Sequence, residues 1–365
     1  FATMGIASLF MPAVMGIIAD RWIPAQRLLG LCHLFAAGFI TLAATRTDYN
    51  SLYTLVLLSV MFYMPTIALS NSVAYNALEK AGLDTVTHFP PIRVWGTVGF
   101  ICAMWVVDLG KMGLSATQLY FSATLGLILG LYSFTLPNCP INRSGGGKSI
   151  VDLLGLRAFA LFKQRKMAIF FIFSMLLGMS LQTTNAFADG YIKSFGDTGI
   201  HGAKYLGTFG VEHSTILISL SQISETLCIL LIPFFLKRFG IKRVMLIAMF
   251  AWVLRFALLG AGNPGPGVWM FILSMIVYGV AFDFFNISGS LFVEKETSAA
   301  IRSSAQGVFM IMTNGLGALI GSYLAGWVVN HYGWPLSWYL FAGFSLVVAI
   351  VFAVIFKYKH DPNRI

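Results

Sequence analysis

The chain has 365 residues, of which 58% are hydrophobic and 10% are charged, and its mean hydropathy is +0.80. Ordinary soluble domains carry roughly 25% charged residues, so this composition excludes a typical soluble domain and predicts an integral membrane protein. The formal net charge of +10 does not indicate nucleic-acid binding, because the basic residues are distributed unevenly between the predicted loops.

Eleven apolar segments are long enough, or nearly long enough, to cross a bilayer, which takes about 20 helical residues. Backbone groups in lipid must be satisfied within the segment, and the alternating pattern of a barrel strand is absent, so we predict helices. The expected fold is all-α and membrane-embedded. The segments lie at 1–19, 28–45, 51–78, 91–107, 112–136, 167–188, 213–236, 244–262, 267–292, 303–329 and 333–356.

The first predicted loop contains Gly16, Asp20 and Arg21 in a Gly-x-x-x-Asp-Arg pattern, followed by Arg27. This pattern resembles the loop motif between the second and third helices of the major facilitator superfamily. The later Gly-Arg part of that motif is replaced here by Ile-Pro-Ala-Gln-Arg. A generic basic loop is the alternative interpretation.

A polar connection at 138–166 carries six basic residues and follows the first five predicted spans. Basic loops at 19–27 and 236–243 indicate a weak internal repeat, which is typical of transporters. If the halves correspond, the first half lacks one span at its start. We therefore expect two six-helix bundles, 1–137 (five of six spans) and 167–365, joined by a cytoplasmic loop at 138–166, with the first helix missing.

Basic residues fix the predicted orientation. With the C-terminus inside, 19 of the 24 Lys and Arg residues lie on the inner side, four lie on the outer side, and Arg255 lies within a span. Short cytoplasmic loops carry this excess of basic residues in membrane proteins, so we expect a cytoplasmic C-terminus.

Glu225 and Asp283 each lie inside an apolar run that is predicted to cross the membrane. A carboxylate at that depth is costly and usually functional. Ser221, Gln222, Ser224 and Thr226 surround Glu225 in the sequence and suit an ionised hydrogen-bond acceptor. Phe rings flank Asp283 and disfavour its charged form, so we predict that Asp283 carries a coupled proton and that Glu225 binds substrate. The reverse assignment stays open.

Polar and aromatic side chains recur at helical spacing in the same spans, which places them on shared helix faces. Amides, carboxylates and aromatic rings together favour a polar, planar solute, because rings stack on a nucleobase and amides bind its donors and acceptors. The sets are Arg93, Thr97 and Phe100; Gln182 and Asn185; Gln222 and Glu225; Tyr278 and Phe282; and Asp283 and Asn286.

Structural interpretations of these residues stay open. Arg93 can snorkel to the interface, and Arg255 is interpreted as a snorkelling or paired structural residue. Thr97, Gln182 and Asn185 could be hydrogen-bond partners between helices. Phe100, Tyr278 and Phe282 could pack without binding a ligand.

Taken together, these residues resemble the bacterial nucleoside permeases of the nucleoside:proton symporter family. The resemblance covers almost the whole chain and is carried by THFPPIRVWGTVGFICAMWVV, ALFKQRKMAIFFIFSMLLG, SQISETLCILLIPFF, SMIVYGVAFDFFNISGS and FKYKH. It implies a major facilitator fold, an inner-membrane location and proton-driven import of purine and pyrimidine nucleosides. It also implies substrate contacts at Arg93, Thr97, Phe100, Gln182, Asn185, Gln222, Glu225, Tyr278, Phe282 and Asp283.

Two alternative functions would need different sets of residues. One is proton-coupled symport of another polar solute, such as a sugar, which also binds acids, amides and aromatic rings. The other is a membrane enzyme or receptor, for which the sequence offers no nucleophile–base set, metal cluster or ectodomain. The four scattered cysteines indicate neither a disulfide framework nor a metal site. We expect no cofactor, no nucleic-acid partner, contact with membrane lipid, and a monomer.

Overall fold

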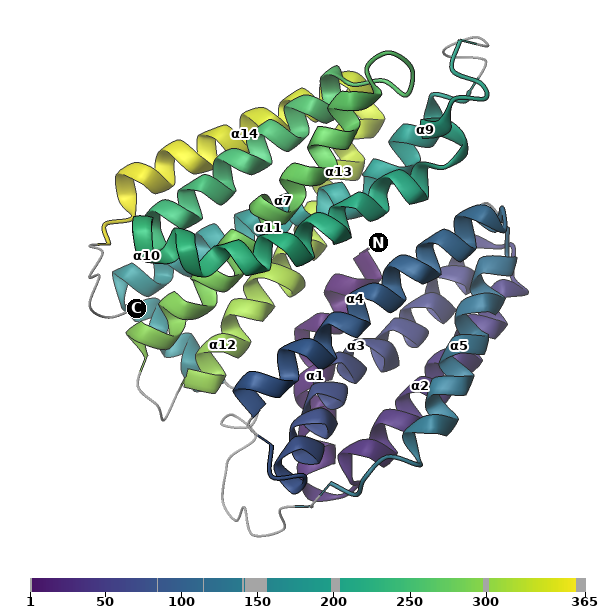
Figure 1. Ribbon diagram of the computed structural model, residues 1–365, viewed down its shortest axis with the longest axis vertical. Helices are drawn as coiled ribbons and strands as arrows, with labels where there is room; N and C mark the ends of the chain where they lie inside the picture. The colour runs from purple at the N-terminus through teal and green to yellow at the C-terminus, as the bar shows by residue number, and fades with distance from the viewer. Residues whose placement is uncertain are drawn as a thin grey trace. The chain divides into compact units, whose positions relative to one another are not determined.

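The computed structural model describes residues 2–83, 85–113, 115–139, 141, 156–197, 204–297 and 302–358 (Figure 1). These residues are mostly helical, and none of them forms a strand. Seven of the described helices are long and apolar enough to cross a membrane. This arrangement confirms the predicted all-α membrane fold.

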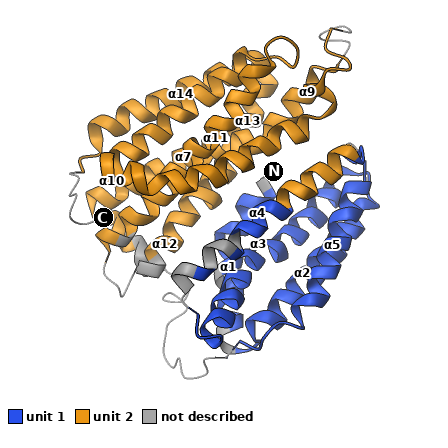
Figure 2. Ribbon diagram, in the orientation of Figure 1, with its two compact units in different colours: residues 1–99, 110–156 blue, residues 100–109, 157–365 orange. Residues whose placement is uncertain are grey.

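The chain divides into two compact units, residues 1–99 with 110–156 and residues 100–109 with 157–365 (Figure 2). The second unit therefore includes the last part of α4 (Thr85–Leu109). The predicted bundle limits of 1–137 and 167–365, and the connecting loop at 138–166, stay a prediction.

The first unit is built around α2, which packs against α3 and α5, while α1 packs against α3. A buried apolar cluster that includes Met11, Leu28 and Leu69 holds these helices together. Asp48 caps the start of α3 by accepting a hydrogen bond from the Ser51 backbone amide at 2.8 Å, and this bond lowers the pKa of the Asp48 carboxyl group. The helices are α1 (Ala2–Arg21), α2 (Ala25–Ala44), α3 (Tyr49–Lys80) and α5 (Thr117–Ser133).

The second unit has a large aromatic core, in which Phe170, Trp252, Phe256 and Trp338 are almost fully buried. Within it, α10 packs along α11 and α14, and α7 packs against η2 and α13. Its elements are η1 (Leu156–Lys163), α7 (Arg165–Ser194), α9 (Phe209–Glu212), α10 (Ser214–Ala261), α11 (Val268–Glu296), α12 (Arg302–Met310), η2 (Ile311–Gly317), α13 (Ala318–Tyr332) and α14 (Trp334–Ile355).

Helix α10 contains two of the predicted spans, 213–236 and 244–262, without the loop that we expected between them. The chain instead turns at Gly240, which has φ 76° and ψ 166°. Residues with a Cβ rarely adopt such a positive φ, so glycine permits the turn. With the two arms of α10 counted separately, and α12, η2 and α13 counted as one run, the described helices other than the short η1 and α9 match the eleven predicted segments.

The segment predicted as one helix at 303–329 contains a π-helical stretch, η2, between α12 and α13. Glycines let this run approach α7 closely. A Cβ at Gly178 would lie 2.2 Å from the Thr313 carbonyl oxygen, and one at Gly317 would lie 2.6 Å from the Met175 carbonyl oxygen. Small residues allow such close backbone contact between membrane helices.

We expect Gly178→Ala to destabilise the second unit, because its methyl group would collide with the η2 backbone. Overpacking of this kind typically costs about 1–3 kcal/mol. The matched control is Gly326→Ala on α13, where an added Cβ would lie 3.7 Å from the Phe187 ring, at ordinary contact distance. Thermal unfolding of the purified variants in detergent checks this, and equal melting temperatures for both variants would contradict the close contact.

Candidate functional site

Helix α11 provides four neighbouring polar or aromatic side chains in the middle of the second unit. Tyr278 and Asp283 are buried, whereas Phe282 and Asn286 are half-buried. The rings of Tyr278 and Phe282 stack with centroids 5.9 Å apart and an interplanar angle of 17°. One turn of helix separates these two rings, so α11 has an aromatic surface formed by the half-buried Phe282 and backed by the buried Tyr278.

Glu225 on α10 lies close to this surface. It interacts electrostatically with both Tyr278 and Asp283, so the structure brings together the two acids that the sequence singled out. Two carboxylates at close range repel each other when both are ionised. The pair can therefore respond to the binding of one proton or one polar ligand.

Close contact between α10 and α11 fixes the position of Glu225. The Ser224 hydroxyl donates a hydrogen bond to the Ile276 carbonyl oxygen. A Cβ at Gly279 would lie 2.6 Å from the Ser224 carbonyl group, so the two backbones touch there. The helix that carries Glu225 is thus held directly against the helix that carries Asp283.

The hydroxyl groups around Glu225 differ from the sequence-based expectation. Those of Ser221 and Thr226 donate to the Met275 sulfur at 3.1 Å and to the Gln222 carbonyl oxygen at 3.1 Å. The Ser224 hydroxyl donates to the Ile276 carbonyl oxygen of α11. Each hydroxyl has one proton to donate, so these three groups stabilise helices rather than the Glu225 carboxylate.

Among the described residues, Asp283 and Trp338 each have a buried polar side-chain atom without a hydrogen-bond partner, and Asp283 is the acid of the two. The residue is only 3% exposed, and within the described part of the chain its Oδ2 atom has no hydrogen-bond partner. Leaving a charged oxygen buried without a partner is costly. The position therefore suits a group that binds a proton or a ligand from outside the protein.

Arg255 is a buried cation directly beneath the aromatic surface. Its Nε and Nη2 atoms donate to the Thr184 hydroxyl at 3.0 Å and 2.9 Å, and Nη1 donates to the Ser274 carbonyl oxygen at 2.6 Å. Its guanidinium lies 4.6 Å from the centre of the Tyr278 ring. Arg255 is 2% exposed, which rules out snorkelling and confirms the interpretation as a paired structural residue.

Helix α7 adds the predicted amides. Gln182 is buried, whereas Asn185 is exposed and lies within reach of the Tyr278 hydroxyl. Gln222, on α10, is half-buried one turn from Glu225. The structure thus places seven of the ten predicted residues on α7, α10 and α11 of one unit.

The other three predicted residues lie on α4. The side chain of Arg93 lies outside the described residues. Thr97 is half-buried and belongs to the first unit. Phe100 begins the part of α4 that clusters with the second unit, and its side chain is 53% exposed. That these three residues contact a substrate together with the other seven stays a prediction.

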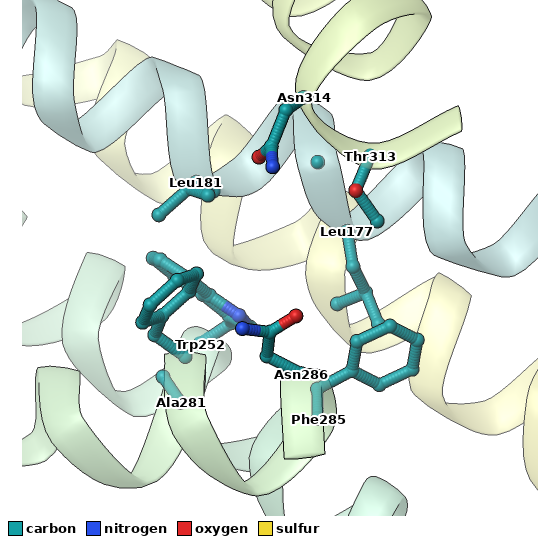
Figure 3. Close-up of a pocket in the computed structure, with 10 residues that line it drawn as sticks. Leu177, Leu181, Trp252, Ala281, Phe285, Asn286, Thr313 and Asn314 are labelled. Carbon is teal, nitrogen blue, oxygen red and sulfur yellow. The ribbon is translucent and has the colours of Figure 1, made fainter. Parts of the chain in front are cut away.

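Beside Phe282, side chains from four elements line a narrow pocket (Figure 3). Sequence reasoning missed Trp252 and Asn314, which line the pocket from α10 and η2. The pocket lining includes Leu181, Trp252, Phe282, Asn286, Thr313 and Asn314.

Among the described residues, no three His, Cys, Asp or Glu side chains gather to hold a metal ion.

Comparison with known proteins identifies close relatives along the whole chain. The family profile described as "Nucleoside H+ symporter" matches residues 1–361. The nucleoside permease NupG of Escherichia coli (strain K12) is 50% identical over 367 residues, 99% of this chain and 87% of the permease. The xanthosine permease of the same strain is 50% identical over 372 residues, 100% of this chain and 88% of that relative.

Solved structures agree with these likenesses. A crystal structure of the nucleoside transporter NupG matches with a TM-score of 0.89 at 51% identity, over 98% of this chain and 89% of that one. A mutant of the peptide transporter POT matches with a TM-score of 0.70 at 14% identity, over 97% and 84% of the two chains. The second match shows the fold alone. Together they confirm the predicted major facilitator fold.

We expect Arg255 and Thr184 to be energetically coupled, because one hydroxyl accepts two guanidinium hydrogen bonds. Thr184→Val should destabilise the protein with Arg255 present but have little effect in the Arg255→Leu background, with a coupling energy of about 0.5–3 kcal/mol. Unfolding of the four purified proteins measures this energy.

The control is Thr183→Val, since the Thr183 hydroxyl donates to the Met179 carbonyl oxygen at 2.9 Å and bonds within its own helix. It should have the same effect in both backgrounds. If Thr184→Val also has equal effects in both, the proposed coupling is wrong.

Proposed function

This chain belongs to the nucleoside H+ symporter family, and we propose that it imports nucleosides together with protons across the bacterial inner membrane. Membership makes the chain a transporter rather than an enzyme. One observation carries the proposal. A stacked aromatic pair, Tyr278 and Phe282, lies near two acids, Glu225 and Asp283, inside membrane-spanning helices. Stacking suits a nucleobase, and the acids suit a proton and sugar hydroxyls.

We assign the coupled proton to Asp283. Its burial and its unpartnered Oδ2 atom support this role, because a neutral carboxyl group avoids the cost of a buried charge. We assign substrate binding to Glu225, which is less buried and lies beside the aromatic pair. The ten predicted contact residues, Arg93 and Thr97 included, complete the proposed site.

The proposed mechanism is alternating access, in which two helical bundles rock about a site near the middle of the membrane. Proton and nucleoside binding together would favour the transition to the inward-open state. The basic residues support a cytoplasmic C-terminus. We also propose a monomer surrounded by lipid. Uptake of labelled uridine and adenosine by transport-deficient cells, with and without a protonophore, tests the function.

We expect uptake to be abolished by the protonophore. Inhibition of this uptake by free sugars but not by free nucleobases would instead favour the alternative of a symporter for another polar solute. No uptake by a properly inserted protein would contradict nucleoside transport.

Asp283→Asn should abolish proton-driven accumulation while leaving nucleoside exchange down a gradient, because the amide cannot bind and release the proton. Uptake by cells is measured with and without the protonophore. The control is Glu212→Gln, which removes an exposed carboxylate on α9. Full protonophore-sensitive accumulation by Asp283→Asn would show that another group carries the proton.

Glu225→Gln should raise the KM for nucleosides about 10- to 100-fold, because a hydrogen bond to a charged group contributes about 1.5–3 kcal/mol. Uptake should still respond to the protonophore. The concentration dependence of uridine uptake measures the change. If the KM is unchanged and the sensitivity to the protonophore is lost, the assignment is reversed: Glu225 would carry the proton and Asp283 would bind the substrate.

A further inference from the structure

The narrow pocket beside Phe282 combines apolar walls with two amide side chains. Leu181 and Trp252 form apolar walls, and the Asn286 and Asn314 amides lie among them (Figure 3). We call this hollow the amide pocket. It has room for little more than a water-sized group, so it can receive one edge of a ligand but not a whole nucleoside.

The two amides are not used by the fold. Within the described part of the chain, Asn286 makes no hydrogen bond, and Asn314 makes only a 3.7 Å contact from Nδ2 to the Met310 sulfur. Sulfur is a weak acceptor. Figure 3 shows both amide groups facing the same space. Both side chains are half-buried and neither amide is a buried group left without a partner, so both amides are accessible to hydrogen-bond a ligand.

The backbone holds one of these amides in a special position. Asn314 belongs to the π-helical segment η2, and such segments frequently occur at functional sites. Thr313 lies directly against Gly178 of α7, and the Thr313 hydroxyl donates to the Phe309 carbonyl oxygen at 2.9 Å. The wall that carries Asn314 is therefore fixed against α7.

Phe282 connects the amide pocket to the candidate site. It lines the pocket, and its ring also stacks on Tyr278. A planar ring placed on the Phe282 surface would have its edge within range of the hollow. An amide group has both donors and an acceptor, so it can bind either an amino group or a carbonyl oxygen.

We propose that the amide pocket binds the exocyclic group of the nucleobase, and that Asn286 and Asn314 determine base preference by hydrogen-bonding that group. This inference rests on the proposed nucleoside transport. It assigns a recognition role to two residues outside the ten predicted contacts. Because each amide can present either a donor or an acceptor, amino-bearing and carbonyl-bearing bases both fit.

The test compares adenosine with purine riboside, which is adenosine without its 6-amino group. Both compete with labelled uridine for uptake by cells that carry the wild-type chain, Asn286→Ala or Asn314→Ala. We expect the wild type to prefer adenosine. Each variant should reduce that preference about three- to tenfold, the effect of losing one hydrogen bond, with purine riboside affinity changed less than about twofold.

Asn330→Ala is the matched control, because Asn330 is an exposed amide at the far end of α13. Asn286→Ser and Asn314→Ser, with membrane abundance measured by immunoblot, replace any alanine variant that fails to insert. An unchanged preference in transporting variants, or no preference in the wild type, overturns the inference. Absence of all nucleoside uptake by the wild type would instead overturn the proposed function.

Discussion

The absence of water inside the membrane governs how this protein places its polar side chains. A polar group within a span must find a partner in the protein or remain costly. Arg255 illustrates the first outcome, because Thr184, Ser274 and the Tyr278 ring surround its guanidinium. Asp283 illustrates the second, since one of its carboxylate oxygens has no partner among the described residues. Arg255 therefore stabilises the site, whereas Asp283 is available to bind a proton or a ligand.

Support for the site comes from helices that touch at their backbones. Gly279 brings α11 against Ser224, one residue from Glu225, and Gly178 brings α7 against Thr313, one residue from Asn314. In both places a glycine fixes the helix next to a polar side chain that can contact a ligand. Membrane helices gain little from burying apolar surface against each other, so contacts of this kind largely set their spacing. The glycines thus determine the dimensions of the site as well as its stability.

Sequence reasoning predicted the features that hydrophobicity and charge determine locally. The eleven spans, the two membrane acids and the amides of α7 follow from apolar run length and from the cost of polar groups in lipid. The partners of Arg255 were beyond reach, because Thr184 and Ser274 lie 71 and 19 residues away in the chain. The same holds for the amide pocket, whose lining comes from four elements, and for η2, whose sequence has no distinct periodicity. The hydroxyls around Glu225 misled the prediction, because sequence neighbours on a helix point in different directions.

The turn at Gly240 has a consequence for how the protein enters the membrane. Two spans meet there with only one non-helical residue, and Lys237, Arg238, Lys242 and Arg243 lie within three residues of it. Carrying a basic side chain through the middle of the bilayer costs about 2.5–3.5 kcal/mol, so four together form a large barrier. We therefore propose that the two arms of α10 insert together and that the basic turn between them stays on the cytoplasmic side. On this proposal the turn itself would set the orientation of both arms during assembly.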